Sequence, residues 1–151
     1  PGLRNLHEDK HIKNLIDSLE QRVIELNFIK PIFIKISPDE PYEVIKSTAE
    51  YIKNSSLTGL IISNTTTNRE MLKNSKYKDF QGGLSGSPLM ERSTSLLKKI
   101  NEEFPELPII GVGGVMNKLD FDNKLASGAS LVQIYTGFII NGPQIVSDIL
   151  N

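Results

Sequence analysis

Four short apolar runs alternate with segments of helical periodicity along this chain of 151 residues. The runs have the length and the β-branched content of buried strands, and they are Ile32–Ile36, Gly59–Ser63, Pro108–Val112 and Leu131–Tyr135. In the segments around them, apolar residues recur every three or four positions, as on one face of a helix. Strands that alternate with helices demand a parallel sheet joined by right-handed crossovers. The sequence therefore predicts the α/β class.

The number of these units limits the architecture. A (β/α)8 barrel needs about 250 residues, so about four parallel βα units amount to roughly half of one. An open four-stranded sheet with helices on both faces is the alternative. Helices are expected over residues 12–26, 39–52, 96–104, 120–126 and 145–150. No linker or low-complexity segment divides the chain, so we treat residues 1–151 as part of a single domain.

Composition excludes several classes of function. The net charge is −1 and there is no basic block, which argues against nucleic acid as a partner. Cysteine is absent, so neither disulfides nor thiolate metal sites are possible. His7 and His11 are four residues apart, but without a carboxylate-rich partner motif we expect exposed helix residues and no metal site. No stretch approaches the ~20 apolar residues of a membrane-spanning helix.

Short polar side chains follow the second predicted strand without a break, from Ser63 through Asn64 and Thr65 to Thr67. In parallel α/β proteins ligands bind at the carboxyl ends of the strands. Neutral amide and hydroxyl groups there suit a flat, polar, heteroaromatic ligand. The alternative is a polar turn that caps the next helix.

A lysine lies inside the first predicted strand. Period-two alternation places Phe33, Lys35 and Ser37 on the face opposite the isoleucines. A buried charge is costly unless it meets a partner, so Lys35 is a candidate for a fixed cation beside a group that becomes anionic during a reaction. Alternatively, its side chain extends to solvent near the strand end.

Three further segments carry glycines where a backbone would approach a ligand, and they are Gln81–Pro88, Pro108–Gly114 and Leu131–Gly137. The first reads equally well as an ordinary flexible loop. The other two are strands that run directly into glycine-bearing ends, although neither matches dinucleotide-binding or P-loop spacing. Barrels frequently bind phosphate with the loops after their last two strands. These two strand ends therefore predict a phosphate-binding site.

Five ordered motifs resemble those of the dihydroorotate dehydrogenase family, and they are Phe33–Asp39, Ile62–Thr66, Gly82–Gly86, Pro108–Gly114 and Gly128–Gly137. The resemblance extends from Pro1 to the last helix. The continuation Phe138–Pro143 is similar to the quinone-linked class 2 enzymes rather than to class 1.

The resemblance implies the C-terminal half of an FMN-binding (β/α)8 barrel. It also implies an enzyme that oxidises dihydroorotate to orotate in pyrimidine biosynthesis and passes electrons to a quinone. Such enzymes are associated with the bacterial cytoplasmic membrane or the mitochondrial inner membrane. The quinone-binding region would lie in an N-terminal half, which we expect to be the partner that closes the barrel.

The resemblance implies roles for individual residues of these motifs. Lys35 resembles the lysine beside the flavin that stabilises the negative charge of reduced FMN, and Ser63 falls at a flavin-contacting position. The residues that resemble the holders of flavin and phosphate are Gly86, Gly113, Gly114, Tyr135 and Thr136. Asn64 and Thr65 resemble the pair that binds the substrate.

One family feature has no counterpart in this chain. The serine that serves as catalytic base lies in a Ser-Pro-Asn-Thr segment before the motif matched by Pro1–Arg4, so we nominate no catalytic residue here. Pro1–Leu6 would be the end of a mobile active-site lid. We therefore expect the segment alone to be inactive. The alternatives are another FMN-dependent barrel enzyme and a non-catalytic half-barrel that binds FMN or phosphate.

Overall fold

The computed structural model describes residues 9–72 and 75–151. Its strands are β1 (Phe33–Ile36), β2 (Gly59–Ile62), β3 (Ile109–Val112) and β4 (Leu131–Gln133). Its helices are α1 (Asp9–Glu25), α2 (Tyr42–Lys53), α3 (Met90–Glu103), α4 (Lys118–Ala126), α5 (Thr136–Asn141) and α6 (Gln144–Leu150), with 3-10 turns η2 (Ser75–Tyr77) and η3 (Ser87–Leu89). The lid expected at Pro1–Leu6 lies outside the described residues.

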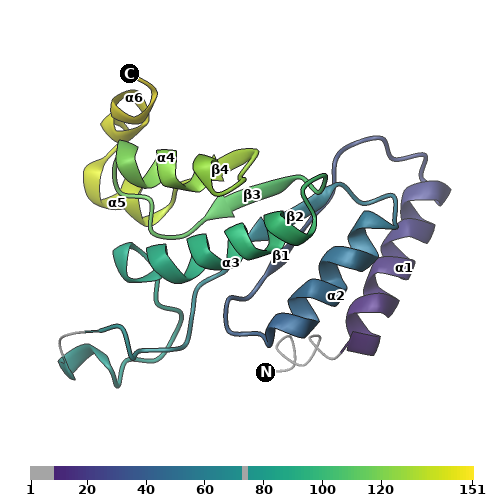
Figure 1. Cartoon of the computed structure of the whole chain (residues 1–151), viewed down its shortest axis with the longest axis horizontal. Coiled ribbons are helices and arrows are strands. Elements are labelled where there is room, and N and C mark those ends of the chain that lie inside the picture. The colour runs from purple at the N-terminus through teal and green to yellow at the C-terminus, as the bar shows by residue number, and fades with distance from the viewer. Residues whose placement is uncertain (1–8, 73–74) are drawn as a thin grey trace.

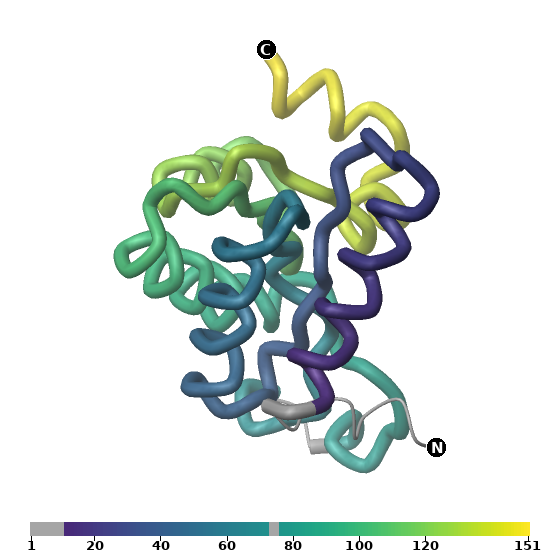
Figure 2. The backbone as a smooth tube through the Cα atoms, turned by 90° about the vertical axis from the view of Figure 1, so that its right-hand side faces the viewer, coloured from purple at the N-terminus to yellow at the C-terminus, as the bar shows by residue number. Residues whose placement is uncertain are grey.

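The four strands form one parallel sheet in the order β1-β2-β3-β4, so neighbours in the sheet are also consecutive in the chain. A doubly wound open sheet reverses its strand order at a switch point, and this sheet does not. Right-handed crossovers in one direction carry the connecting helices to one face, as in a barrel. α2 and α3 lie in front of the strands and α1 lies beside α2 (Figure 1). Figure 2 shows the α1–α2 pair from the side.

The core lies between this face of the sheet and the helices. Ile36, Leu60, Ile62 and Ile109 point toward the helices and are buried. They meet buried residues of α1, α2 and α3, which are Ile12, Ile16, Ile45, Ala49, Ile52, Leu97 and Ile100. Each large aliphatic side chain contributes roughly 1.5–3 kcal/mol by its burial. The apolar faces that predicted these helices thus pack into one core with the sheet.

The opposite face of the sheet is largely uncovered by the described elements. The strand register places Lys35, Ile61, Ile110 and Leu131 in one row across it. Ile61 and Ile110 are only partly buried, Lys35 is exposed, and Leu131 is 62% exposed. In a closed barrel this face forms the packed interior.

The end of the chain differs from the prediction. The fourth strand ends at Gln133 rather than Tyr135, because the backbone of Tyr135 leaves the β region (φ −127°, ψ −71°) and begins the short helix α5. Six residues are too few to establish a helical period, so the sequence pattern did not indicate α5. Among the described residues, no helix combines the length and the apolar character needed to span a bilayer.

Candidate functional site

A pocket of about 110 Å³ lies at the carboxyl ends of the four strands. Residues in the last two positions of the strands or just after them line it, together with the turn that begins at Ser85. All nine residues nominated from the sequence line this one pocket, and they are Lys35, Ser63, Asn64, Thr65, Gly86, Gly113, Gly114, Tyr135 and Thr136. The structure therefore brings together segments that are up to a hundred residues apart. What each residue binds remains a prediction.

The end of β2 carries one buried polar residue, Ser63, and two exposed ones, Asn64 and Thr65. Ser63 is 2% exposed, and its Oγ donates to the carbonyl of Asn64 at 2.9 Å. The peptide that links Ile62 to Ser63 is cis. Asn64 and Thr65 are exposed at the pocket. The Asn64 N–H donates to the carbonyl of Ile36 at 2.7 Å, and Asn64 Oδ1 accepts from the Thr65 N–H at 2.9 Å. The segment is thus held to the end of β1 while its amide nitrogen and hydroxyl face outward.

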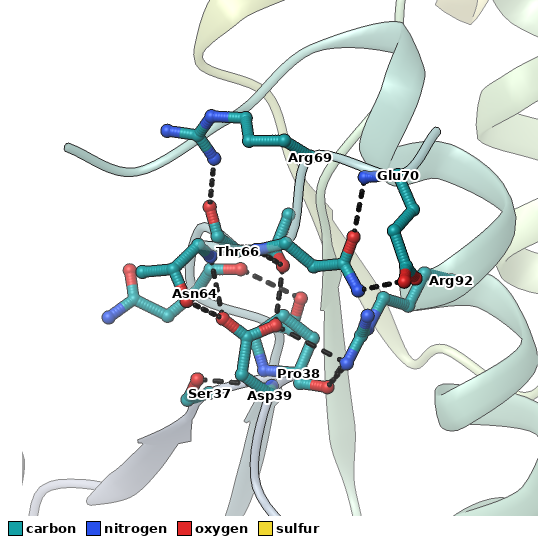
Figure 3. A network of polar contacts seen from close by, with 11 residues as sticks. Ser37, Pro38, Asp39, Asn64, Thr66, Arg69, Glu70 and Arg92 are labelled. Carbon is teal, nitrogen blue, oxygen red and sulfur yellow. Dashed lines mark hydrogen bonds and ion pairs between the residues drawn. The ribbon is translucent and has the colours of Figure 1, made fainter. Parts of the chain in front are cut away.

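A carboxylate network holds the next residues of this segment (Figure 3). Asp39, in the loop between β1 and α2, accepts hydrogen bonds from the hydroxyl of Thr66 and from the N–H and hydroxyl of Thr67, the last two at 2.6 and 2.9 Å. Arg92 of α3 lies 3.3 Å from Asp39, and its Nε and Nη2 donate to the carbonyl of Pro38 at 3.0 and 2.8 Å. Asp39 therefore fixes the segment that carries Asn64 and Thr65.

The network sets the charge state of Asp39. Partial burial raises the pKa of this carboxyl group, but hydrogen bonds from Thr66 and Thr67 and the charge of Arg92 outweigh burial, so the pKa lies below its usual value. The sequence pattern indicated Asp39 only as part of a helix start. Its contacts with residues 27 and 28 positions away leave no local signal that could have revealed this role.

Replacing Asp39 with Asn should destabilise the fold by about 1–2 kcal/mol, because charge-assisted hydrogen bonds are lost. Since the folded pKa lies below the unfolded value, the carboxylate stabilises the fold above about pH 4, and this stabilisation is lost as pH falls through the folded pKa. Urea unfolding of the full-length protein that carries this sequence, measured from pH 3 to pH 7, checks both effects. Asp17→Asn, in an exposed ion pair with Lys13, is the control. Equal losses in the two variants would contradict the prediction.

Glycines form the other side of the pocket. Gly113 and Gly114 have φ values of +106° and +87°, which L side chains rarely adopt. A Cβ at Gly114 would lie 2.4 Å from Cα of Met90, so the loop after β3 packs directly on the start of α3. The hydroxyl of Thr136 donates to Ser85 Oγ at 2.9 Å, which joins the start of α5 to the loop that contains Gly86. Loops from three parts of the chain thus meet here.

Lys35 enters the pocket from the uncovered face of the sheet. It forms no ion pair with a carboxylate of the described residues. An unpaired cation at the edge of a ligand pocket is available for a group that develops negative charge.

Sequence reasoning nominated none of the other seven residues that line the pocket, which are Ser85, Leu89, Val112, Val115, Gln133, Ile134 and Gly137. Gln133 pairs in register with Val112, so the period-two argument used for Lys35 would have found it. Of the two histidines, His11 is exposed on α1, and His7 lies outside the described residues. Within residues 9–72 and 75–151, no group of three or more His, Cys, Asp or Glu could hold a metal ion.

Comparison with known proteins supplies the family. The family model for dihydroorotate dehydrogenase matches residues 1–151. The chain is 42% identical over 150 residues to the dihydroorotate dehydrogenase (quinone) of Christiangramia forsetii, covering 99% of this chain and 44% of that protein. It is 42% identical over 156 residues to the enzyme of the same name from Psychromonas ingrahamii, covering 100% of this chain and 46% of that one.

Solved structures agree with the sequences. The DHODH of Eimeria tenella in complex with ferulenol superposes with a TM-score of 0.88 and 30% identity, over 98% of this chain and 44% of that one. The chain thus spans less than half the length of the relatives it matches. Its four βα units correspond to about half of the (β/α)8 barrel of these enzymes, as expected. With a matching family model over its whole length and relatives of 42% identity, this chain belongs to the dihydroorotate dehydrogenase family.

Proposed function

We propose that this chain forms the FMN-binding side of a quinone-linked dihydroorotate dehydrogenase, which oxidises dihydroorotate to orotate in pyrimidine biosynthesis. The observation that carries the proposal is the convergence of the nine nominated residues on one pocket in a chain of this family. FMN would supply the hydride acceptor of the reaction and deliver the electrons to a quinone. The quinone and membrane association rest on the family and on the names of the relatives.

The pocket suits FMN in its chemistry. Leu89, Val112 and Ile134 provide an apolar lining on which a planar ring could lie. The left-handed glycines of the β3 loop bring backbone close to the pocket, as phosphate binding requires. At about 110 Å³ the pocket is smaller than the roughly 300–1,000 Å³ of most ligand sites. We therefore assign its opposite wall to the part of the protein that this chain does not span.

Each side of the pocket would have its own task. Ser63 and Lys35 would contact the flavin ring, with Lys35 as the positive charge that balances its reduced state. Gly86, Gly113, Gly114, Tyr135 and Thr136 would hold the ribityl phosphate. The amide of Asn64 and the hydroxyl of Thr65 would hydrogen-bond dihydroorotate and fix its orientation. Asp39 would maintain that orientation through Thr66 and Thr67.

The full-length protein that carries this sequence provides the test. Its flavin is released by denaturation and identified by mass, and bleaching of the bound flavin by dihydroorotate is recorded without oxygen. We expect FMN, bleaching by dihydroorotate and reoxidation by a quinone. Bound FMN that dihydroorotate leaves oxidised would favour another FMN-dependent barrel enzyme, and the absence of any flavin would overturn the proposal.

Substitution of Gly114 by Ala should weaken FMN retention by at least about tenfold. The new Cβ would meet the backbone of Met90, and the positive φ is unfavourable for alanine, so the β3 loop must shift away from its observed position. Gly142→Ala is the matched control, because Gly142 also has a positive φ but nothing lies within 4 Å of its Cβ position. Flavin content after gel filtration and the Kd for FMN measure the effect. Full FMN content at unchanged affinity in Gly114→Ala would place the phosphate elsewhere.

A further inference from the structure

A fully buried lysine lies behind the β3 loop. Lys124 of α4 is 0% exposed, and its Nζ lies 2.6 Å from the hydroxyl oxygen of Ser93, which is itself 0% exposed on α3. A Cβ at Gly111 would be 3.3 Å from Cδ of Lys124, so the lysine stem packs against β3. Lysine is almost never fully buried unless it is paired, and burial of this one therefore points to a specific task.

Ser93 connects this lysine to the candidate phosphate site. Its hydroxyl donates to the carbonyl of Gly113 at 3.0 Å, and the carbonyl of Met90, at 3.2 Å, is the other acceptor within reach. The Gly113 carbonyl and the Gly114 N–H belong to one planar trans peptide and point in opposite directions. A Gly113 carbonyl drawn toward α3 therefore turns the Gly114 N–H away from α3. Both glycines line the pocket, and the Gly114 N–H has no acceptor among the residues that the structure describes.

The lysine controls which way the serine hydrogen points. A protonated lysine has three N–H donors and no acceptor, so it must donate to Ser93 Oγ and leaves the serine hydrogen for Gly113. A neutral amine has a lone pair that can accept the hydrogen of Ser93. When Ser93 donates its hydrogen to the neutral amine, the Gly113 carbonyl loses its donor. The charged form of Lys124 is thus the one that supports the observed loop.

We propose that Lys124, acting through Ser93, is a positioning residue that holds the Gly113–Gly114 peptide with its N–H directed at the phosphate of FMN. The inference rests on the proposed function, because it assigns a ligand to that peptide. The lysine contacts neither flavin nor substrate. Its task is to keep the loop ready for an anion before the anion arrives.

The surroundings of Lys124 make this support dependent on pH. Burial lowers the pKa of Lys124 to about 8, while the charge of Asp120 acts in the opposite direction. Asp120 lies on the same helix and accepts a hydrogen bond from the Met116 N–H at 3.0 Å. From α3 and β3 the lysine meets Ser93 and Gly111, which are uncharged. Lys124 therefore loses its proton as pH rises through about 8, and the support of the loop is lost with it.

Comparison of FMN with riboflavin, which has no phosphate, isolates this effect. The full-length protein is stripped of flavin, and the Kd of each flavin is measured by fluorescence at pH 7. Lys124→Met and Ser93→Ala should each raise the Kd for FMN roughly tenfold, and the double variant should be no worse than either. The Kd for riboflavin should change by less than about twofold. Lys118→Met on the same helix and Thr94→Ala on α3 are the matched controls and should leave both constants unchanged.

The wild-type protein supplies an independent measurement. Between pH 7 and pH 9.5 the charge of the phosphate is nearly constant, since its second pKa is about 6. The ratio of the FMN Kd to the riboflavin Kd should rise with a midpoint near pH 8 and should be flat in Lys124→Met. Equal shifts of the two Kd values would show a purely structural role and overturn the inference. If Lys124→Met does not fold, the wild-type protein alone decides, and a ratio that stays flat from pH 7 to pH 9.5 would overturn the inference. Wild-type protein that binds neither flavin would instead contradict the proposed function.

Discussion

Residues 1–151 on their own are expected to give no measurable oxidation of dihydroorotate. The resemblance to the family assigns the catalytic base to a segment that no part of this chain matches, and a general base contributes roughly 10²–10⁴-fold. The pocket, moreover, is smaller at about 110 Å³ than most ligand sites, and loss of the flavin would remove the hydride acceptor altogether.

An assay with a dye as electron acceptor checks this expectation, because a dye does not depend on the quinone-binding region. The isolated chain is supplied with excess FMN and compared with the full-length protein at equal molar concentration. Circular dichroism of the same sample establishes whether the chain is folded. Turnover by the isolated chain near that of the full-length protein would show that residues 1–151 contain the whole catalytic apparatus.

Substitution of Lys35 by Met in the full-length protein should slow flavin reduction roughly 100-fold, which corresponds to about 3 kcal/mol for one preorganised electrostatic interaction. The positive charge has no carboxylate partner among the described residues, so no competing anion would weaken the proposed interaction with the flavin. The negative charge that Lys35 would balance arises only as hydride is transferred. The binding of dihydroorotate should therefore change much less than the rate.

Stopped-flow recording of flavin absorbance at saturating dihydroorotate measures the rate, and its dependence on dihydroorotate concentration measures binding. Lys30→Met, an exposed lysine in the turn before β1, is the control. If Lys35→Met retains FMN and reduces it at the wild-type rate, Lys35 is only a strand residue whose side chain reaches solvent.

The nine pocket residues could be predicted because one rule connects them. Carboxyl ends of neighbouring parallel strands meet at one edge of the sheet, so polar or glycine-rich residues after each strand must converge. Asn64–Thr65 and Gly113–Gly114 are forty-nine positions apart in the chain and line the same pocket for this reason. Strand order followed from the same logic, since consecutive right-handed units build the sheet in sequence.

The supporting residues obey no such rule. Asp39 and Lys124 act through contacts that depend on how a loop folds and how two helices cross, and neither is visible in a local pattern. A lysine in a helix is normally an exposed residue, so nothing in the helix expected over residues 120–126 singled out Lys124. The helix α5 escaped prediction because its six residues show no period. Prediction from the sequence thus reached the groups that face the pocket and stopped at those that hold them in place.

The strand order also determines how firmly each side of the pocket is held. Among the strands that the structure describes, β2 and β3 have a neighbour on both sides, whereas β4 has one. Leu60, Ile62 and Ile109 are 0% exposed, while Leu131 is 62% exposed. Local opening costs least where buried contacts are fewest, so backbone amides should exchange with deuterium slowest in β2 and β3 and fastest in β4. The Asn64–Thr65 side is then preformed within this chain, and the Tyr135–Thr136 side acquires its rigidity only when another strand pairs with β4.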